Sequence, residues 1–518
     1  MGAGGLSGVG IEPPTVGGGG GGTGGRGRRG LRGAALRGFF WLVVQTVGSR
    51  AVTFASQIAL AWLLVPEAFG LMALAQTAMS VVLLVQHIGI RDVLIQRSHK
   101  VGLWSGHAYW FSFAVGLAAS LVMAVLAPVA AAVYGEPELT GVVLVLAAAP
   151  LPRALANVSQ AVLRTRMRFR SVAMLEFGAT AGIAAMAVTL AWLGFGAYAL
   201  ALPVPIAAGM VLLVGNRLAG VGSPGRLRPG RWGYLVSSGA VLLLSRVCLL
   251  IAQQGDYMVL GLFRGAEMVG LYFFAFNLSL QTVRLLTENL VGVLLPALSE
   301  MKGDVERATA AFVRAARLLG AVGVPVALLQ LVFAGPIVTT LFEEKWHGAA
   351  GLVRLLSVAM MFQLLGVSTA SMLKSQRRYR VVLGLAAMQA LVLLALATPA
   401  AWLGGEEDAA WWVALAVVGY SAITSPVRVM VAVRPGGIGA AAALELFGRP
   451  LLAGVAGASV GWLACELAGL DPVRSWGGAS LASAVGLPVY AAAARSLMPD
   501  AFGEIVSIAR RGGRGRGG

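Results

Sequence analysis

The chain has 518 residues, of which 58% are hydrophobic and only 12% are charged. Soluble globular proteins carry about a quarter charged residues, so this composition excludes a soluble globular protein and indicates a chain that lies mostly within a membrane. The formal net charge of +18 does not indicate a nucleic-acid-binding protein, because the cations occur in short groups between apolar stretches and not on a polar domain.

The first 36 residues differ in composition from the rest of the chain. A run of glycines at 17–22 is followed by several arginines, without apolar periodicity. Such a segment, 1–36, is typical of a disordered cytoplasmic tail. It lacks the apolar core and the small-residue cleavage site of a signal peptide. Residues 501–518 are also basic, and we expect them to form a second cytoplasmic tail.

Apolar stretches follow one another from residue 39 onward. A window of about twenty residues predicts about fourteen transmembrane helices, and therefore an all-α polytopic membrane protein. The predicted spans lie near 39–64, 68–90, 106–133, 140–163, 171–194, 196–216, 232–262, 269–296, 315–341, 350–372, 381–403, 410–433, 449–469 and 477–496.

Positive charge alternates along these spans. Most of the 40 Lys and Arg residues lie in the terminal segments or in the loops after even-numbered spans, whereas the loops after odd-numbered spans contain only Arg264, Lys345 and Arg474. Because cytoplasmic loops are enriched in Lys and Arg, this pattern places both termini in the cytoplasm.

Two short matches indicate an internal repeat. A shift of 200 residues superposes Glu67, Gly70, Leu71 and Ala75 on Glu267, Gly270, Leu271 and Ala275. A shift of 210 residues superposes segment 163–170 on 373–380. Both matches fall at the same position in a unit of six helices. Because six is an even number, the two units share one orientation, and substrate sites in such folds lie between the units.

The repeat divides the chain into regions. We expect an N-terminal lobe at 37–220 with helices 1–6, and a C-terminal lobe at 221–435 with helices 7–12. Helices 13 and 14, at 436–500, lie outside the repeat.

Several charged side chains fall within the predicted spans. They are Arg50, Arg153, Arg246, Arg284, Arg354, Asp256, Glu288 and, nearer a membrane boundary, Glu176. A charge at the centre of a bilayer costs at least about 2.5–3.5 kcal/mol, so such residues face a cavity or a partner. Polar residues at helical spacing accompany the charges on helices 1, 2, 7 and 8, which are equivalent pairs of the two repeats.

These polar stripes predict a substrate cavity. The candidate substrate-binding residues are Arg50, Arg246, Arg284, Gln57, Asn277 and Gln281, and the candidates for coupling to an ion gradient are Glu288 and Asp256. A purely structural interpretation stays open, because Arg284 and Glu288 are four residues apart and can neutralise each other. Arg153 can bond carbonyl groups freed by a proline kink, and Arg354 can extend to the outer surface.

No catalytic or metal-binding pattern is evident. Cys248 and Cys465 lie in apolar segments, and the four histidines have no ligand spacing. We therefore expect no metal, no cofactor and no enzymatic activity.

Seven short motifs occur in order between residues 40 and 435. They are AWLLVPEAFGL (61–71), IGIRDVLIQR (88–97), LRTRMRFR (163–170), GFGAYAL (194–200), DYMVLG (256–261), GLY (270–272) and PALS (296–299). In order and spacing they resemble the oligosaccharide-lipid flippases of the multidrug/oligosaccharidyl-lipid/polysaccharide exporter (MOP) superfamily, in particular the polysaccharide biosynthesis (Wzx-type) branch. Trp62 departs from this pattern, because the family usually has a basic residue there.

The resemblance implies two six-helix lobes around a cation-rich cavity that opens alternately to the two membrane faces. The implied substrate is an oligosaccharide linked to polyprenyl diphosphate, which crosses the bacterial inner membrane. Membrane lipids, and a polysaccharide polymerase and glycosyltransferases, are the expected partners; no nucleic acid is expected. In related flippases, helices equivalent to 13 and 14 form an apolar groove for the lipid tail.

Three alternatives remain at this point. A multidrug or cation antiporter of the same superfamily would need a cavity rich in carboxylates, whereas these stripes carry more Arg than acid. A peptidoglycan-precursor flippase is less favoured by the motifs. A membrane glycosyltransferase or polymerase would need a catalytic carboxylate set or a large outer loop, and no nucleotide-binding Gly-rich motif follows a strand.

Overall fold

A computed structural model describes residues 24–86, 101–166, 168–220, 240–300, 304–366, 369–376, 378–405 and 408–514. Within these ranges every regular element is a helix. Eleven of the helical segments in the described part of the chain are long and apolar enough to cross a membrane. The predicted fold class, an all-α polytopic membrane protein, is therefore confirmed.

The first bundle contains the helices that precede residue 220. They are α1 (Gly24–Leu63), α2 (Pro66–Gln86), α4 (Val101–Tyr134), α5 (Glu138–Ala147), α6 (Pro150–Thr165), α7 (Phe169–Trp192), α8 (Tyr198–Ala201) and α9 (Pro203–Ala219).

The second bundle follows, and three further helices end the chain. The second bundle contains α11 (Ala240–Glu300), α12 (Val305–Leu341), η3 (Glu344–Trp346), α13 (Ala349–Gly366), α14 (Thr369–Ser375), α15 (Tyr379–Leu403), α16 (Ala409–Val433) and η4 (Arg434–Gly436). The last helices are α17 (Ala440–Leu467), α18 (Trp476–Leu497) and α19 (Pro499–Arg514).

The helix boundaries differ from the predicted spans in three ways. Helix α1 already begins at Gly24, so the last part of segment 1–36 is helical, and no proline interrupts it. The predicted spans 232–262 and 269–296 meet in α11 at a bend without a loop between them, where the backbone of Gly265 is not helical, with a φ of 72°. The predicted span 140–163 is divided between α5 and α6 where Pro150 starts a new helix, because proline lacks the N–H that a continuous helix needs.

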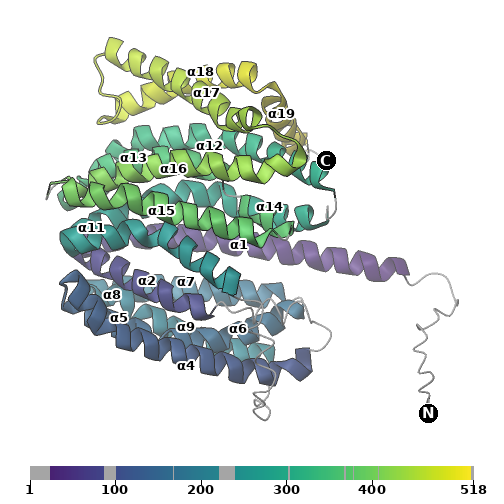
Figure 1. Ribbon diagram of the computed structural model, residues 1–518, viewed down its shortest axis with the longest axis vertical. Coiled ribbons are helices and arrows are strands. Elements are labelled where there is room, and N and C mark those ends of the chain that lie inside the picture. Colours follow the sequence, from purple (N-terminus) through teal and green to yellow (C-terminus); the bar gives the residue numbers. More distant parts are fainter. Residues whose placement is uncertain are drawn as a thin grey trace, which may run out of the picture.

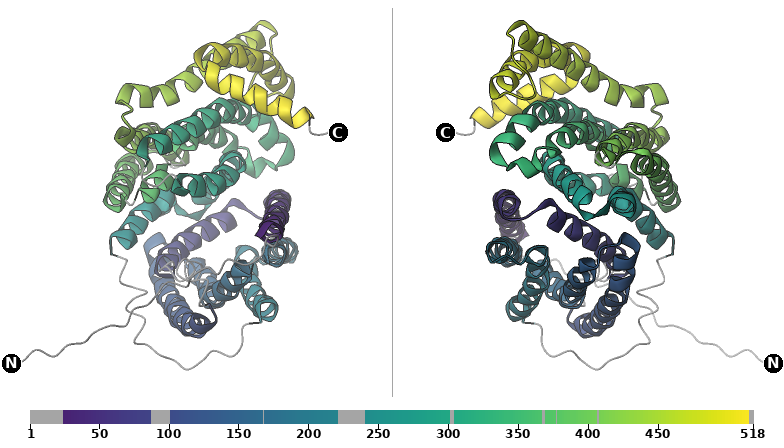
Figure 2. Two further views of the ribbon diagram at one scale, coloured as in Figure 1. Left: turned by 90° about the vertical axis from the view of Figure 1, so that its right-hand side faces the viewer. Right: turned by 90° about the vertical axis from the view of Figure 1, so that its left-hand side faces the viewer.

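The bundles are stacked along the longest axis of the molecule, with α17, α18 and α19 on top (Figure 1). Figure 2 shows the same three layers from the sides. Corresponding helices pack in both bundles: α4 with α6, α6 with α9 and α7 with α9 in the first, and α12 with α13, α13 with α16 and α15 with α16 in the second. The order of helix packing is thus similar in the two bundles.

The turns paired by the shift of 210 residues have the same backbone geometry. Arg168, before α7, has φ −83° and ψ 56°, and Arg378, before α15, has φ −84° and ψ 55°. The amide of each residue donates a hydrogen bond of 3.0 Å to the carbonyl of a leucine five residues earlier, Leu163 or Leu373. Two similar local sequences have thus folded in the same way.

Exposed tryptophans mark one edge of the bundles. They lie at or next to the ends of α1, α7 and α15 and the starts of α16 and α18: Trp62, Trp192, Trp402, Trp411, Trp412 and Trp476. Tryptophan is enriched at membrane–water interfaces. The distribution of positive charge along the sequence predicts that these helix ends lie on the outer side, and this edge is called the outer face below. The start of α1 and the end of α19 both lie toward the opposite side (Figure 1).

Candidate substrate site and apolar groove

Helices α1 and α11 meet through polar side chains between the two bundles. Nη1 of Arg50 donates to Oε1 of Gln281 over 3.3 Å, and Nε2 of Gln281 donates to Oε1 of Gln57 over 3.5 Å. Arg50 and Gln57 are two turns apart on α1, so one side chain of α11 contacts both ends of this stripe. Three of the predicted substrate-binding residues are therefore brought together by the fold.

The lengths of these two hydrogen bonds indicate how strong they are. N–H···O bonds in proteins are usually 2.7–3.2 Å long, so bonds of 3.3 and 3.5 Å are weak ones. A guanidinium group has five N–H donors and binds carboxylates and phosphates through two parallel bonds. All three side chains are only partly buried. The hydrogen bond between Arg50 and Gln281 is thus weaker than the bonds that a guanidinium group forms with an anion.

The other predicted residues lie on α11. Asn277 is one turn before Gln281, and its Nδ2 donates to the Phe273 carbonyl over 2.9 Å. Arg246 is partly buried in the first half of the helix. Arg284 and Glu288 follow Gln281 on the same helix, and their side chains lie outside the described residues.

Asp256 occupies a different environment from the polar contact. Its side chain is buried, with 3% exposed. One carboxylate oxygen accepts a bond of 2.8 Å from the Tyr272 hydroxyl, and the other accepts one of 3.0 Å from the Tyr257 amide. Asp256 and Tyr272 lie on opposite sides of the bend at Gly265. This carboxylate therefore joins the two halves of α11.

Two further charges have structural partners. Glu176 forms an ion pair of 2.8 Å with Arg164. Nη2 of Arg354 donates over 2.7 Å to the carbonyl of Val473, in the loop between α17 and α18. Arg354 thus attaches the last membrane helices to the second bundle, which supports the structural interpretation of this residue.

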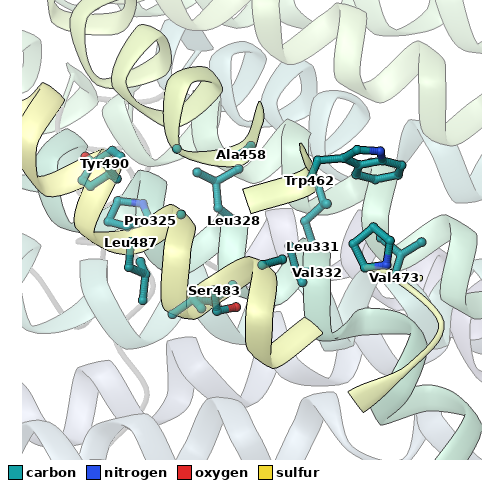
Figure 3. Close-up of a pocket in the computed structure, with 15 residues that line it drawn as sticks. Pro325, Leu328, Leu331, Val332, Ala458, Trp462, Val473, Ser483, Leu487 and Tyr490 are labelled. Atoms are coloured by element: carbon teal, nitrogen blue, oxygen red, sulfur yellow. The ribbon is translucent and has the colours of Figure 1, made fainter. Parts of the chain in front are cut away.

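An apolar groove lies between α12, α17 and α18, as Figure 3 shows. It has a volume of about 130 Å³, and its walls include Leu328, Ala458, Trp462, Leu487 and Tyr490. The groove is where the resemblance to related flippases placed one. The sequence alone does not indicate the individual lining residues, because an apolar residue in a groove and an apolar residue that faces lipid have the same hydropathy.

The departure at Trp62 has a counterpart in the structure. Nε1 of Trp62 donates to the Leu341 carbonyl over 2.7 Å. The ammonium group of Lys345 lies 3.2 Å from the Trp62 carbonyl and pairs with Glu343 over 2.7 Å. A cation from the second bundle therefore lies beside the position where the family usually has a basic residue.

Comparison with known proteins identifies the family of this chain. The family model described as polysaccharide biosynthesis protein matches residues 59–351, which is more than half of the chain. The chain belongs to this family. The resemblance that the sequence motifs indicated is thereby confirmed.

Curated proteins of polysaccharide biosynthesis are distant relatives of this chain. The succinoglycan biosynthesis transport protein ExoT of Rhizobium meliloti is 25% identical over 62% of this chain and 65% of its own length. The match thus spans slightly less than two thirds of ExoT. The lipopolysaccharide biosynthesis protein WzxC of Escherichia coli is 22% identical over 77% of this chain and 81% of its own length.

Solved structures share the fold of this family member. The lipid II flippase MurJ, in an inward closed conformation, aligns with 89% of this chain and 99% of its own with a TM-score of 0.69, at 12% identity. An inward-facing MATE family transporter of the MOP superfamily aligns with 77% of this chain and 96% of its own with a TM-score of 0.56, at 14% identity. The protein is a multi-pass protein of the bacterial inner membrane with a MOP transporter fold.

Proposed function

We propose that this protein is a flippase that moves an oligosaccharide linked to polyprenyl diphosphate from the inner to the outer leaflet of the inner membrane. The observation that supports this most is the contact of Arg50, Gln57 and Gln281 between two bundles of a polysaccharide biosynthesis protein. Alternating access of this site to the two faces would carry the head group across.

The chemistry of the side chains fits the parts of such a lipid. The diphosphate is an anion, and Arg50, Arg246 and Arg284 supply guanidinium groups, which stay charged when partly dehydrated. Gln57, Asn277 and Gln281 supply neutral amides that suit sugar hydroxyl groups. The groove between α12, α17 and α18 has an almost wholly apolar lining, which suits the polyprenyl chain.

We propose that a carboxylate side chain couples transport to an ion gradient. Glu288 lies one turn from Arg284 on α11. We propose that the two side chains pair in the empty carrier and that the diphosphate then takes over Arg284. A carboxylate that loses its cation in a surrounding of low dielectric takes up a proton more readily. Asp256, which is buried and bonded to Tyr272, is the second candidate.

The proposed function is tested with purified protein in lipid vesicles. Three substrates are offered separately: a polyprenyl-diphosphate oligosaccharide, lipid II and a cationic drug. We expect transport of the first only. Transport of the cationic drug alone would establish an antiporter instead, and transport of lipid II alone would establish a peptidoglycan-precursor flippase. Enzymatic conversion of the sugar lipid without transport would contradict the expectation that the protein is not an enzyme.

A further inference from the structure

Two equivalent glycines bring the bundles into direct backbone contact at the outer face. Gly70 lies on α2, and Gly270 lies on the second half of α11. A Cβ atom on Gly70 would overlap the carbonyl oxygen of Ala266, and a Cβ atom on Gly270 would overlap that of Pro66. The contact is reciprocal: Gly70 faces Ala266, four residues before Gly270, and Gly270 faces Pro66, four residues before Gly70. No side chain fits between the two helices at this crossing.

A carboxylate from the first bundle binds the start of the second half of α11. The bend at Gly265 leaves the amide of Ala266 at a helix N-terminus, where amides have no partner within the helix. Oε1 of Glu136, in the loop between α4 and α5, accepts a bond of 2.9 Å from this amide. A side chain of one bundle therefore caps a helix of the other.

Trp346 adds an aromatic contact at the same face. Its side chain is fully buried, and its Nε1 donates to the Ala61 carbonyl at the end of α1 over 2.8 Å. Its ring lies 4.3 Å from that of Phe274 and 5.1 Å from that of Phe69, at an angle of 87°. A residue of η3, between α12 and α13, thus packs against aromatic rings of both bundles.

We infer that these contacts form an outer seal, consisting of Gly70, Gly270, Glu136 and Trp346, and that the two glycines set how strongly the carrier prefers its outer-closed state. Opening of the outer face must separate α2 from α11, and it must hydrate the Ala266 amide and the Trp346 ring. A methyl group on either glycine keeps the helices apart and so weakens only the closed state. The inference rests on the proposed function for its purpose, but not for its test.

The test measures access to the site from outside the cell. The two native cysteines are replaced (Cys248→Ser, Cys465→Ala), and Asn277→Cys serves as the reporter. Spheroplasts are treated with a membrane-impermeant maleimide. With the native seal we expect protection from outside and labelling in inverted vesicles. Gly70→Ala and Gly270→Ala should each raise the rate of labelling from outside at least about fivefold.

Matched controls are available in each bundle. Gly178 on α7 and Gly384 on α15 have open space where a Cβ would lie, so Gly178→Ala and Gly384→Ala should leave the labelling rate unchanged. If the glycine variants do not accumulate, Trp346→Phe and Glu136→Ala are measured with the same reporter, since each removes one hydrogen bond between the bundles. We then expect a rise of about twofold.

The outcomes separate the seal from the function. Unchanged labelling from outside in folded Gly70→Ala and Gly270→Ala, or in both milder variants where those are used, would overturn the inference. Labelling requires no substrate, so this result would leave the proposed flippase activity intact. Conversely, if the glycine variants are labelled faster but the protein moves no sugar lipid, the inference about the seal holds and the proposed function is wrong.

Discussion

The two bundles touch in two places whose chemistry differs. At the outer face, the contact consists of backbone at Gly70 and Gly270, the buried ring of Trp346 and hydrogen bonds of 2.8 and 2.9 Å. Between α1 and α11, the contact consists of flexible polar side chains with bonds of 3.3 and 3.5 Å. At the first contact no side chain fits between the helices. The second contact contains hydrogen-bond donors that could bind a ligand.

This difference separates two tasks of a carrier. A closed face requires a contact that is lost or kept as a whole, which close packing provides because a small gap already forfeits much of the dispersion energy. A binding site requires partners that exchange at little cost. Long hydrogen bonds between partly hydrated groups provide this, because water or a ligand replaces them without leaving a buried polar group unpaired.

The largest expected effect comes from the polar contact. Arg50→Ala should reduce transport at least about tenfold, because a hydrogen bond to a charged group contributes about 1.5–3 kcal/mol. Arg50→Lys should reduce it less, since the charge remains but the fork is lost. Surface polysaccharide is measured in a deletion strain, with protein level recorded and the exposed Arg434→Ala as the control. Full restoration of polysaccharide by both Arg50→Ala and Arg284→Ala would show that neither arginine binds the diphosphate.

The groove offers a test that leaves both contacts between the bundles intact. Ala458→Trp should fill the groove and reduce transport about threefold to tenfold at a normal protein level, because the lipid tail loses its apolar site. Val460 is also exposed on α17 but does not line the groove. Val460→Trp is therefore the control, and equal transport rates in the two variants would remove the groove from the substrate path.

Coupling is expected to change the response to a gradient more than the rate itself. Glu288→Gln should express normally and still transport, but transport in vesicles should no longer respond to an imposed pH gradient. A static pair with Arg284 predicts the opposite: a lower protein level and an unchanged gradient response per molecule. If well-folded Glu288→Gln keeps its gradient response, Asp256→Asn is the next variant to measure.

The smallest effect concerns α19, far from both contacts. Arg314 donates from Nε to the two carboxylate oxygens of Glu504 over 2.9 and 2.8 Å, and this bond lowers the pKa of Glu504. Its stabilisation is complete above the carboxyl's unfolded pKa and is lost as the pH falls through the lower folded pKa. Glu504→Gln should therefore lower Tm slightly at pH 7 but not at acidic pH. Glu306→Gln serves as the control. A loss that persists in acid would indicate packing instead.

Hydropathy and charge predicted most of the fold, because a bilayer constrains both within short stretches of the sequence. Each span needs about twenty apolar residues, and each cytoplasmic loop attracts cations, so both signals are read within a short window. Boundaries were less certain where two spans follow each other without a loop, as at Gly265 in α11. The candidate site was predicted in part: spacing placed Arg50 and Gln57 on one face of α1, but could not select Gln281 as their common partner.

Sequence alone predicted the helical class, the family and the equivalence of Gly70 and Gly270 in the proposed repeat, because these depend on composition and on residues at fixed spacing. Only the tertiary structure decided that the two glycines touch the opposite backbone and that Trp346 lies between Phe69 and Phe274. It also showed that Asp256 joins the halves of α11. The physical reason is that contacts between helices distant in sequence arise from packing, and in an apolar chain a buried residue and a lipid-facing one have the same hydropathy.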